Sequence, residues 1–117
     1  MSKRILKLWF PASMSRAKFP MPVGSKILDV KFESNDEWED PHSVCVWIEG
    51  DKDQRIVQVR SLILDTGQET PSDLWMHTGT CYVPTNAGPY VRHLYMFVSD
   101  LALVEDGEGA EDEEWPS

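Results

Sequence analysis

Long apolar runs, secretion signals and cysteines are absent or scarce in this chain of 117 residues. No run approaches the roughly 18 to 20 apolar residues that cross a bilayer. The apolar stretch near the amino terminus contains Lys7 and stops at Pro11, so we expect no secretory signal. Two cysteines, Cys45 and Cys81, are too few for the disulfide framework of a small secreted domain. We therefore expect one soluble domain that acts inside a cell, with both cysteines in its core.

Charge of one sign is missing from each end of the chain. Residues 1–28 carry six lysines and arginines and no carboxylate, whereas residues 105–117 carry seven carboxylates and no base. Removing the −7 of this tail from the net charge of −9 leaves a body of only −2. The overall acidity argues against general nucleic-acid binding, which needs a dominant basic face. The nearly neutral body still permits a local site for an anion such as a nucleotide phosphate.

Signatures of catalysis and of cofactor binding are missing as well. The chain has no glycine-rich phosphate loop and no close Cys-x-x-Cys or His-x-x-x-His spacing, so we predict neither a cofactor nor a metal site. Cys81 could act as a nucleophile with His77 or His93 as its base, but almost any sequence with these residues allows the same pairing. We therefore expect a protein that is not an enzyme.

Alternation of apolar and polar residues is the dominant pattern that is present, and it is typical of half-buried strands. It recurs between turn residues, while helical patterning is scarce, with room for a short helix only at Ser13–Ala17 or Ser72–Met76. Pro20, Pro22 and Gly24 are expected to break the chain before the second strand. The predicted strands are 5–10, 26–33, 43–49, 55–64, 79–83 and 91–103.

These patterns predict an all-β fold: a small antiparallel sandwich or partly open barrel of about six strands, with an acidic C-terminal tail. We assign residues 1–104 to a single β domain. Residues 105–117 have high charge and little apolar content, so we expect a flexible tail.

Several short motifs together resemble a known protein family. They are Trp9-Phe10-Pro11, Phe19-Pro-Met-Pro-Val-Gly-Ser-Lys-Ile-Leu-Asp-Val30, Val44-Cys-Val-Trp-Ile48, Arg55-Ile-Val, Asp65-Thr-Gly67 and His77-Thr-Gly-Thr80. They are similar to small uncharacterised phage proteins that have an aromatic-Pro start, a Pro-x-Gly-x-Lys-Ile-Leu-x-Val pattern, a Trp-bearing strand and a terminal Gly-Thr strand. The resemblance implies a phage or prophage origin and a compact β fold, and it carries over no catalytic residue. The sequence departs from the pattern in its acidic loop near Asp36 and in its tail.

The best candidate binding site combines aromatic rings, imidazoles, hydroxyls and guanidinium groups near the two last strands. Rings offer a flat surface to a base, and the polar groups offer donors to phosphates. Alternation places Arg92 and His93 on opposite faces of one strand, so they serve one pocket only if that strand is twisted or bulged. The predicted ligand-binding residues are Trp75, His77, Thr78, Thr80, Tyr82, Arg92, His93 and Tyr95, with Arg55 and Arg60; ordinary cross-strand pairing is the alternative reading of the same residues.

A second candidate surface is acidic and carries exposed tryptophans. Carboxylates around an aromatic ring suit docking on a basic groove, where charge steers and the ring anchors. The predicted partner-binding residues are Trp38, Glu113, Glu114 and Trp115. A solubilising tail that folds back on the basic amino-terminal segment is the alternative.

Together with the resemblance to phage proteins, these features lead us to expect a phage accessory protein that neutralises a host component in the host cytoplasm, as an antagonist of defence or during takeover. In one mode it sequesters a nucleotide-like ligand as a homo-oligomer. In the other, its acidic loop and tail block a basic host protein, as a partial DNA mimic. A structural role in the virion is a third possibility. We expect no general nucleic-acid binding and no membrane partner.

Overall fold

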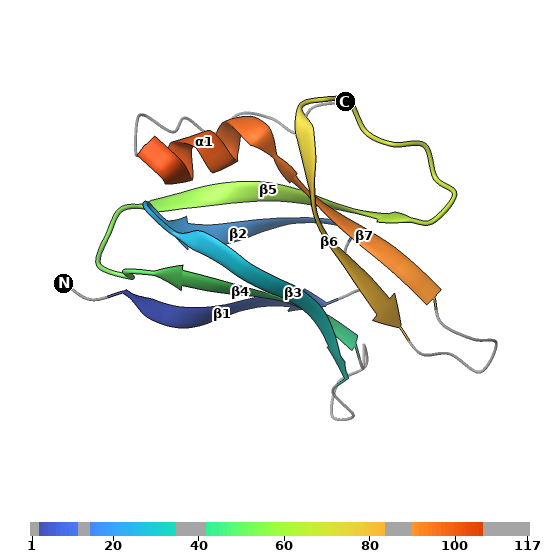
Figure 1. Cartoon of the computed structure of the whole chain (residues 1–117), viewed down its shortest axis with the longest axis horizontal. Helices are drawn as coiled ribbons and strands as arrows, with labels where there is room; N and C mark the ends of the chain where they lie inside the picture. The colour runs from blue at the N-terminus through green and yellow to red at the C-terminus, as the bar shows by residue number, and fades with distance from the viewer. Residues whose placement is uncertain (1–2, 12–14, 35–41, 84–89, 107–117) are drawn as a thin grey trace.

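The computed structural model describes residues 3–11, 15–34, 42–83 and 90–106. These residues contain seven strands and one helix, which are labelled in Figure 1. The strands are β1 (Arg4–Pro11), β2 (Arg16–Pro22), β3 (Lys26–Ser34), β4 (His42–Gly50), β5 (Ile56–Asp65), β6 (Trp75–Val83) and β7 (Tyr90–Phe97), and the helix is α1 (Val98–Asp106).

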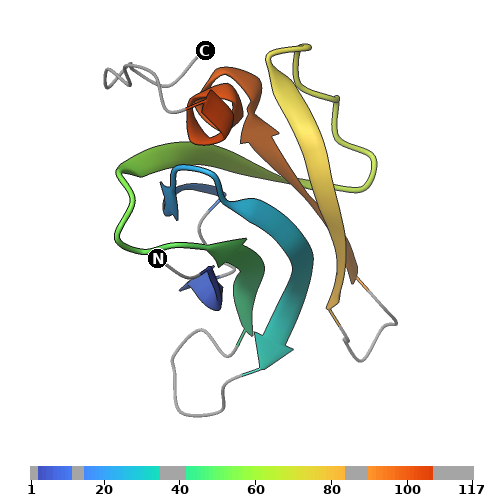
Figure 2. The same ribbon diagram turned by 60° about the vertical axis from the view of Figure 1, so that its left-hand side comes forward.

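The strands form two antiparallel sheets that pack face to face as a sandwich. Sheet A has the order β1-β4-β3, and sheet B has the order β2-β5-β7-β6. Figures 1 and 2 show the two sheets stacked, with α1 beside β5 and the connection from β5 to β6 arching outward. The described strands close no barrel, and the prediction of a small all-β sandwich is confirmed.

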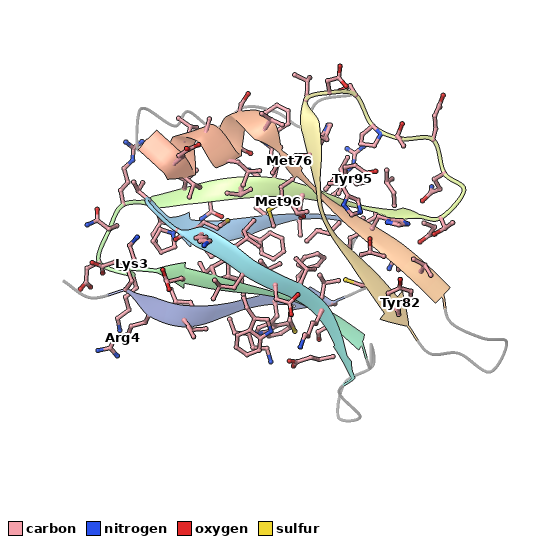
Figure 3. The ribbon with its side chains drawn as sticks, viewed as in Figure 1. Lys3, Arg4, Met76, Tyr82, Tyr95 and Met96 are labelled. Atoms are coloured by element: carbon pink, nitrogen blue, oxygen red, sulfur yellow. The ribbon has the colours of Figure 1, made fainter. Side chains whose placement is uncertain are left out.

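The core lies between the sheets and comes from the alternation seen in the sequence. Val44, Val46 and Ile48 share the inner face of β4 and are buried, and Leu94 and Met96 of β7 do the same on the other sheet. Cys45, on the opposite face of β4, is buried as well. Figure 3 draws the side chains of this interior, with Met96 labelled. Because one face of each central strand is apolar, burial sets which side chains face inward and which face solvent.

Each of the two strands β3 and β6, which pack against one another, has a shift in its register. The register of β3 shifts between Ile27 and Asp29, and that of β6 shifts between His77 and Gly79. A Cβ atom added to Gly79 would lie 2.7 Å from Cβ of Val30. A glycine is therefore required at this crossing for steric reasons.

The strand β2 was not predicted, because its prolines indicated a turn. It pairs with β5 from Arg16↔Leu62 to Pro22↔Ile56 and forms one edge of sheet B. An edge strand has a ladder partner on one side only, so it tolerates Pro20 and Pro22 where a central strand would not. The predicted helix over residues 13–17 is wrong as well, since Arg16 and Ala17 belong to β2.

The helix α1 replaces the end of a predicted strand. The apolar run over residues 91–103 predicted one continuous strand, but β7 ends at Phe97 and α1 follows directly. Asp100 in its first turn accepts hydrogen bonds from the backbone N–H of Arg60 and from its guanidinium, at 2.8–2.9 Å. This buried contact, distant in sequence, holds the helix against β5.

Two boundaries also differ from those predicted. The strand β6 begins at Trp75, four residues before the expected start, so the predicted helix over residues 72–76 is wrong. The helix α1 runs to Asp106, so residues 105 and 106 are helical and not part of a flexible tail. Residues 107–117 lie outside the described part of the chain. No helix within the described residues is long and apolar enough to span a membrane.

Candidate ligand-binding site

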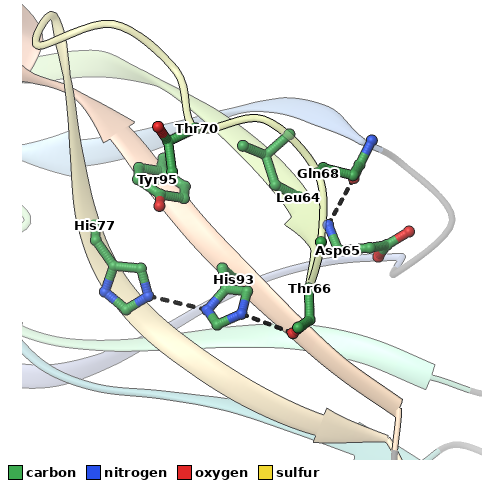
Figure 4. A pocket seen from close by; sticks show the side chains of 9 residues that line it. Leu64, Asp65, Thr66, Gln68, Thr70, His77, His93 and Tyr95 are labelled. Atoms are coloured by element: carbon green, nitrogen blue, oxygen red, sulfur yellow. Dashed lines mark hydrogen bonds between the residues drawn. The ribbon is translucent and has the colours of Figure 1, made fainter.

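A pocket of about 310 Å³ lies on the outer face of sheet B, away from the core. Strands β5, β6 and β7 form its floor, and the connection that follows β5 forms one wall (Figure 4). Its volume is at the lower end of the range for small-molecule sites. The lining residues are Leu64, Asp65, Thr66, Gly67, Gln68, Thr70, His77, His93 and Tyr95.

The register of the strands explains why these side chains share a face. Leu62↔Tyr95 and Leu64↔His93 are opposite one another in β5 and β7, and His77↔Tyr95 and Thr80↔His93 in β6 and β7. In a regular strand, residues three apart point to opposite faces, which would separate His77 from Thr80. The bulge between His77 and Gly79 adds one residue and returns both side chains to the outer face.

Two imidazoles form the polar centre of the pocket. His77 Nε2 lies 3.2 Å from His93 Nδ1, and Thr66 Oγ1 lies 3.0 Å from His93 Nε2. Figure 4 shows this row of three side chains, which joins the wall of the pocket to β7 and β6 of its floor. Thr80 Oγ1 lies 3.2 Å from each of the facing imidazole nitrogens.

The ring of Tyr95 lies beside this polar centre. His77 packs edge-on against Tyr95, with ring centroids 5.2 Å apart, and the His77 and His93 centroids are 5.4 Å apart. Leu64 adds an apolar side chain from β5. Rings with hydroxyl and amide groups beside them suit a ligand that is planar at one part and polar at another.

The connection after β5 is built around a tight turn at Gly67, which has a φ of +96°. A positive φ favours glycine because it has no Cβ atom. Gln68 accepts a hydrogen bond from the backbone N–H of Asp65 at 2.6 Å, which ties the turn to the end of β5. Thr66 and Thr70 thereby face the pocket from its wall.

Arg92 supports the pocket from outside its lining. Its Nε donates to Oδ1 of Asp65 at 2.9 Å, so it holds the residue where the wall begins. Its register partner is the buried Cys81, whereas the partner of His93 is Thr80. Arg92 and His93 thus point to opposite faces of β7, as alternation predicts.

The structure brings together only part of the predicted ligand-binding set. His77, His93 and Tyr95 line the pocket, and Thr80 contacts both histidines. Thr78 occupies the bulge, and its hydroxyl donates to the carbonyl of Leu94 at 3.0 Å. Tyr82 is 66% exposed near the far end of β6 and is not a lining residue.

Three further members of that set lie elsewhere. Trp75 is buried and packs edge-on against Phe97, with ring centroids 5.2 Å apart. Arg60 is buried in its ion pair with Asp100, and its guanidinium lies 4.2 Å from the Phe97 ring centroid. Arg55 is exposed, beyond the end of β5 opposite the pocket.

Sequence reasoning missed the wall of the pocket. Leu64, Thr66, Gln68 and Thr70 line it but were not predicted. The motif Asp65-Thr-Gly67 was noticed only as part of a family pattern, and the turn that it forms is the signal that could have drawn attention to its neighbours. The predicted partner-binding residues Trp38, Glu113, Glu114 and Trp115 lie outside the described residues.

The cysteines do not belong to the pocket. Both are buried, and this burial raises the pKa of each thiol to about 11. In the described ranges, no group of three or more histidine, cysteine, aspartate and glutamate side chains is arranged to hold a metal ion.

Comparison with known proteins gives one match. Residues 1–100 match a family described as a domain of unknown function, DUF7352, which covers every described strand and the start of α1. No curated protein and no solved structure matches the chain.

Proposed function

The chain belongs to the DUF7352 family, a domain of unknown function, and we propose that it is a non-enzymatic binding protein whose pocket on sheet B holds a small nucleotide-like ligand. The observation that carries this proposal is the convergence of Tyr95, His77 and His93 on one face beside two threonine hydroxyls. Rings offer surface to a base, and the hydroxyl and imidazole groups offer hydrogen bonds to its polar edge or to a sugar.

The site supports binding better than catalysis. Attack by a hydroxyl or a thiol needs a base beside it, and the buried thiols, with a pKa of about 11, stay protonated at neutral pH. The two imidazoles contact threonine hydroxyls, which are weak nucleophiles without further activation. Retention of a ligand without turnover is the function that we assign to the pocket.

We place this binding protein in a phage, in the host cytoplasm, where it neutralises a host component as an antagonist of defence or during takeover. The support is the sequence resemblance to small phage proteins. Sequestering a soluble signal requires many copies and a tight site but no enzymatic turnover, which suits a small domain. Exposed strand edges also suit a homo-oligomer.

The first test is a native mass spectrum of the full-length protein purified gently from cells that supply the ligand. We expect a defined oligomer with an extra mass of a few hundred daltons per site. His77→Ala and Tyr95→Ala should lose that mass, while Tyr82→Ala, which removes an exposed ring outside the pocket, should retain it. A bare wild-type protein that also shows no thermal shift with a panel of nucleotides would overturn the proposal.

The same preparations separate this function from its two alternatives. Blockade of a basic host protein by the acidic segments predicts that deleting residues 107–117 abolishes antagonism. Sequestration predicts that this deletion leaves antagonism unchanged. The deletion begins after Asp106 so that α1 stays complete. Abundant copies in purified particles would instead assign the protein to the virion.

A further inference from the structure

Three atoms on the pocket floor lie at equal distances from one another. His77 Nε2, His93 Nδ1 and Thr80 Oγ1 are separated by 3.2 Å in each of the three pairs. Hydrogen bonds prefer a nearly straight donor geometry, and a triangle of three such atoms does not allow all three contacts to be good hydrogen bonds. Hydrogen bonds therefore account for two edges of the triangle, and the third edge brings two polar atoms together without one.

The triangle has the size of one face of a tetrahedral metal site. Ligand atoms about 2.0 Å from a zinc ion are about 3.3 Å from one another when the geometry is tetrahedral. The observed 3.2 Å separations match that edge. Imidazole nitrogens are ligands that Zn²⁺, Ni²⁺, Co²⁺ and Cu²⁺ accept readily.

One tautomer of His93 fits the role of a metal ligand. Thr66 Oγ1 lies 3.0 Å from His93 Nε2 and 3.4 Å from the carbonyl oxygen of Val91. In the tautomer that carries its proton on Nε2, His93 donates to Thr66 Oγ1, whose hydroxyl hydrogen donates to Val91. The lone pair of His93 Nδ1 then faces His77 and Thr80. Histidines that bind metals usually fix their orientation by donating the other ring N–H in this way.

The bulge in β6 is what assembles the three ligands. It brings His77 and Thr80 to the outer face of β6. Their register partners in β7, Tyr95 and His93, lie on the same outer face. Bulges occur next to functional sites because they redirect a side chain. Two strands of a rigid sheet thus fix all three donor atoms.

We propose that His77 Nε2, His93 Nδ1 and Thr80 Oγ1 bind a divalent transition-metal ion such as Zn²⁺, with its remaining position open to the pocket. Such an ion would bind an oxygen of a small-molecule ligand. It would also bring positive charge to a pocket whose lining includes no lysine or arginine, since Arg60 and Arg92 are paired with Asp100 and Asp65. Metal binding does not depend on the ligand proposed above.

The test uses the metal-stripped full-length protein and Zn²⁺ alone, in a buffer with excess Mg²⁺ to occupy carboxylate sites. Nitrogen-15 NMR of the histidine rings reports which nitrogen binds the metal. We expect Zn²⁺ to shift His77 Nε2 and His93 Nδ1, while His93 Nε2 keeps its proton. Calorimetry should give one Zn²⁺ per chain.

Variants make the assignment specific. His77→Ala and His93→Ala should each weaken Zn²⁺ binding by at least about tenfold, and Thr66→Val by about 10- to 100-fold because it removes the acceptor that orients His93. Thr80→Val should weaken binding, and Thr80→Ser should restore it. His42→Ala, which changes the third histidine, on sheet A, is the matched control and should bind as the wild type does.

Circular dichroism of each variant checks that it is folded, and all four substituted pocket residues are at least partly exposed. Equal Zn²⁺ affinity in the wild type and in the folded His77→Ala/His93→Ala double variant would overturn the proposal, as would ring nitrogens that do not shift at saturating Zn²⁺. A protein that binds Zn²⁺ here but retains no small molecule would support this inference while contradicting the proposed function.

Discussion

Gly79 is a single residue on which the packing of the two sheets depends. A Cβ atom at this position would approach Cβ of Val30 to 2.7 Å, closer than real Cβ contacts come. Since backbone neighbours on both strands must shift to relieve this, Gly79→Ala should lower the free energy of unfolding by about 1–3 kcal/mol. Urea denaturation of the variant and the wild type measures the difference.

The double variant Gly79→Ala/Val30→Gly is the control for this mechanism. It removes the atom that the new methyl group would strike, so its cost should be smaller than the sum of the two single costs. If the two losses in the free energy of unfolding are additive, the loss in Gly79→Ala arises within β6 and not from its contact with β3.

The buried cysteines predict how stability depends on alkaline pH. Burial raises the pKa of both thiols from an ordinary 9.0 to about 11, so in the unfolded chain they ionise at a lower pH than in the folded chain. Their contribution to stability is therefore complete below pH 9.0 and is lost as the pH rises toward about 11. Denaturation midpoints measured across this window should fall.

Alkaline pH acts on the whole protein, so the contribution of the thiols needs a comparison of its own. The Cys45→Ala/Cys81→Ala variant should show a shallower fall in stability over the same window. An identical slope would contradict the role of the thiols. Below this window, we expect both thiols of the native protein to resist a thiol reagent until denaturant is added.

At the residue scale, the sequence predicted three of the residues that line the pocket but not its full membership. Alternation places His93 and Tyr95 on one face of β7, and the register of β6 places His77 opposite Tyr95. Arg60 was assigned to the ligand because nothing in its own neighbourhood reveals Asp100, which is 40 residues away. Thr66 and Thr70 were missed because only the folded turn brings them over the sheet.

Among the elements, α1 is attached to β5 by a buried ion pair. The side chains of Arg60 and Asp100 are each 5% exposed, and Asp100 accepts three hydrogen bonds. Because removing one member leaves a buried charge without compensation, Asp100→Ala should cost about 3–5 kcal/mol of stability. Thermal unfolding and hydrogen exchange of α1 amides measure the effect.

The neighbouring Ser99 provides the matched control for α1. Its side chain is exposed on the same turn, so Ser99→Ala should change stability by less than about 0.5 kcal/mol. If Asp100→Ala costs no more than Ser99→Ala, the ion pair does not hold the helix in place.

Elements with strict alternation were the ones that the sequence could predict. Strands β3, β4 and β5 lie close to their expected ranges because each has one buried face. The strand β2 was missed because its status as an edge strand, which tolerates its prolines, is a property of the whole sheet. The helix α1 was missed because a short apolar run fits a strand or a helix equally well until its partner is known.

For the whole molecule, connectivity predicts slow folding. Most strand pairs join segments far apart in the chain, namely β1 with β4, β2 with β5, and β5 with β7. Loop closure must precede these contacts, and all-β domains with such topology fold in milliseconds to seconds. Stopped-flow refolding by Trp fluorescence should therefore show its main phase on that timescale, and a microsecond phase carrying the whole amplitude would contradict this expectation.

Strands β5, β6 and β7 have an inner face in the core and an outer face at the pocket, and this division determines which positions can change in sequence. Residues such as Leu94 and Met96 hold the sandwich together, while their immediate neighbours His93 and Tyr95 only meet the pocket. Substitutions at every second position can thus change the lining of the pocket while the architecture persists. A library restricted to the outer positions is the direct way to vary this lining on a constant scaffold.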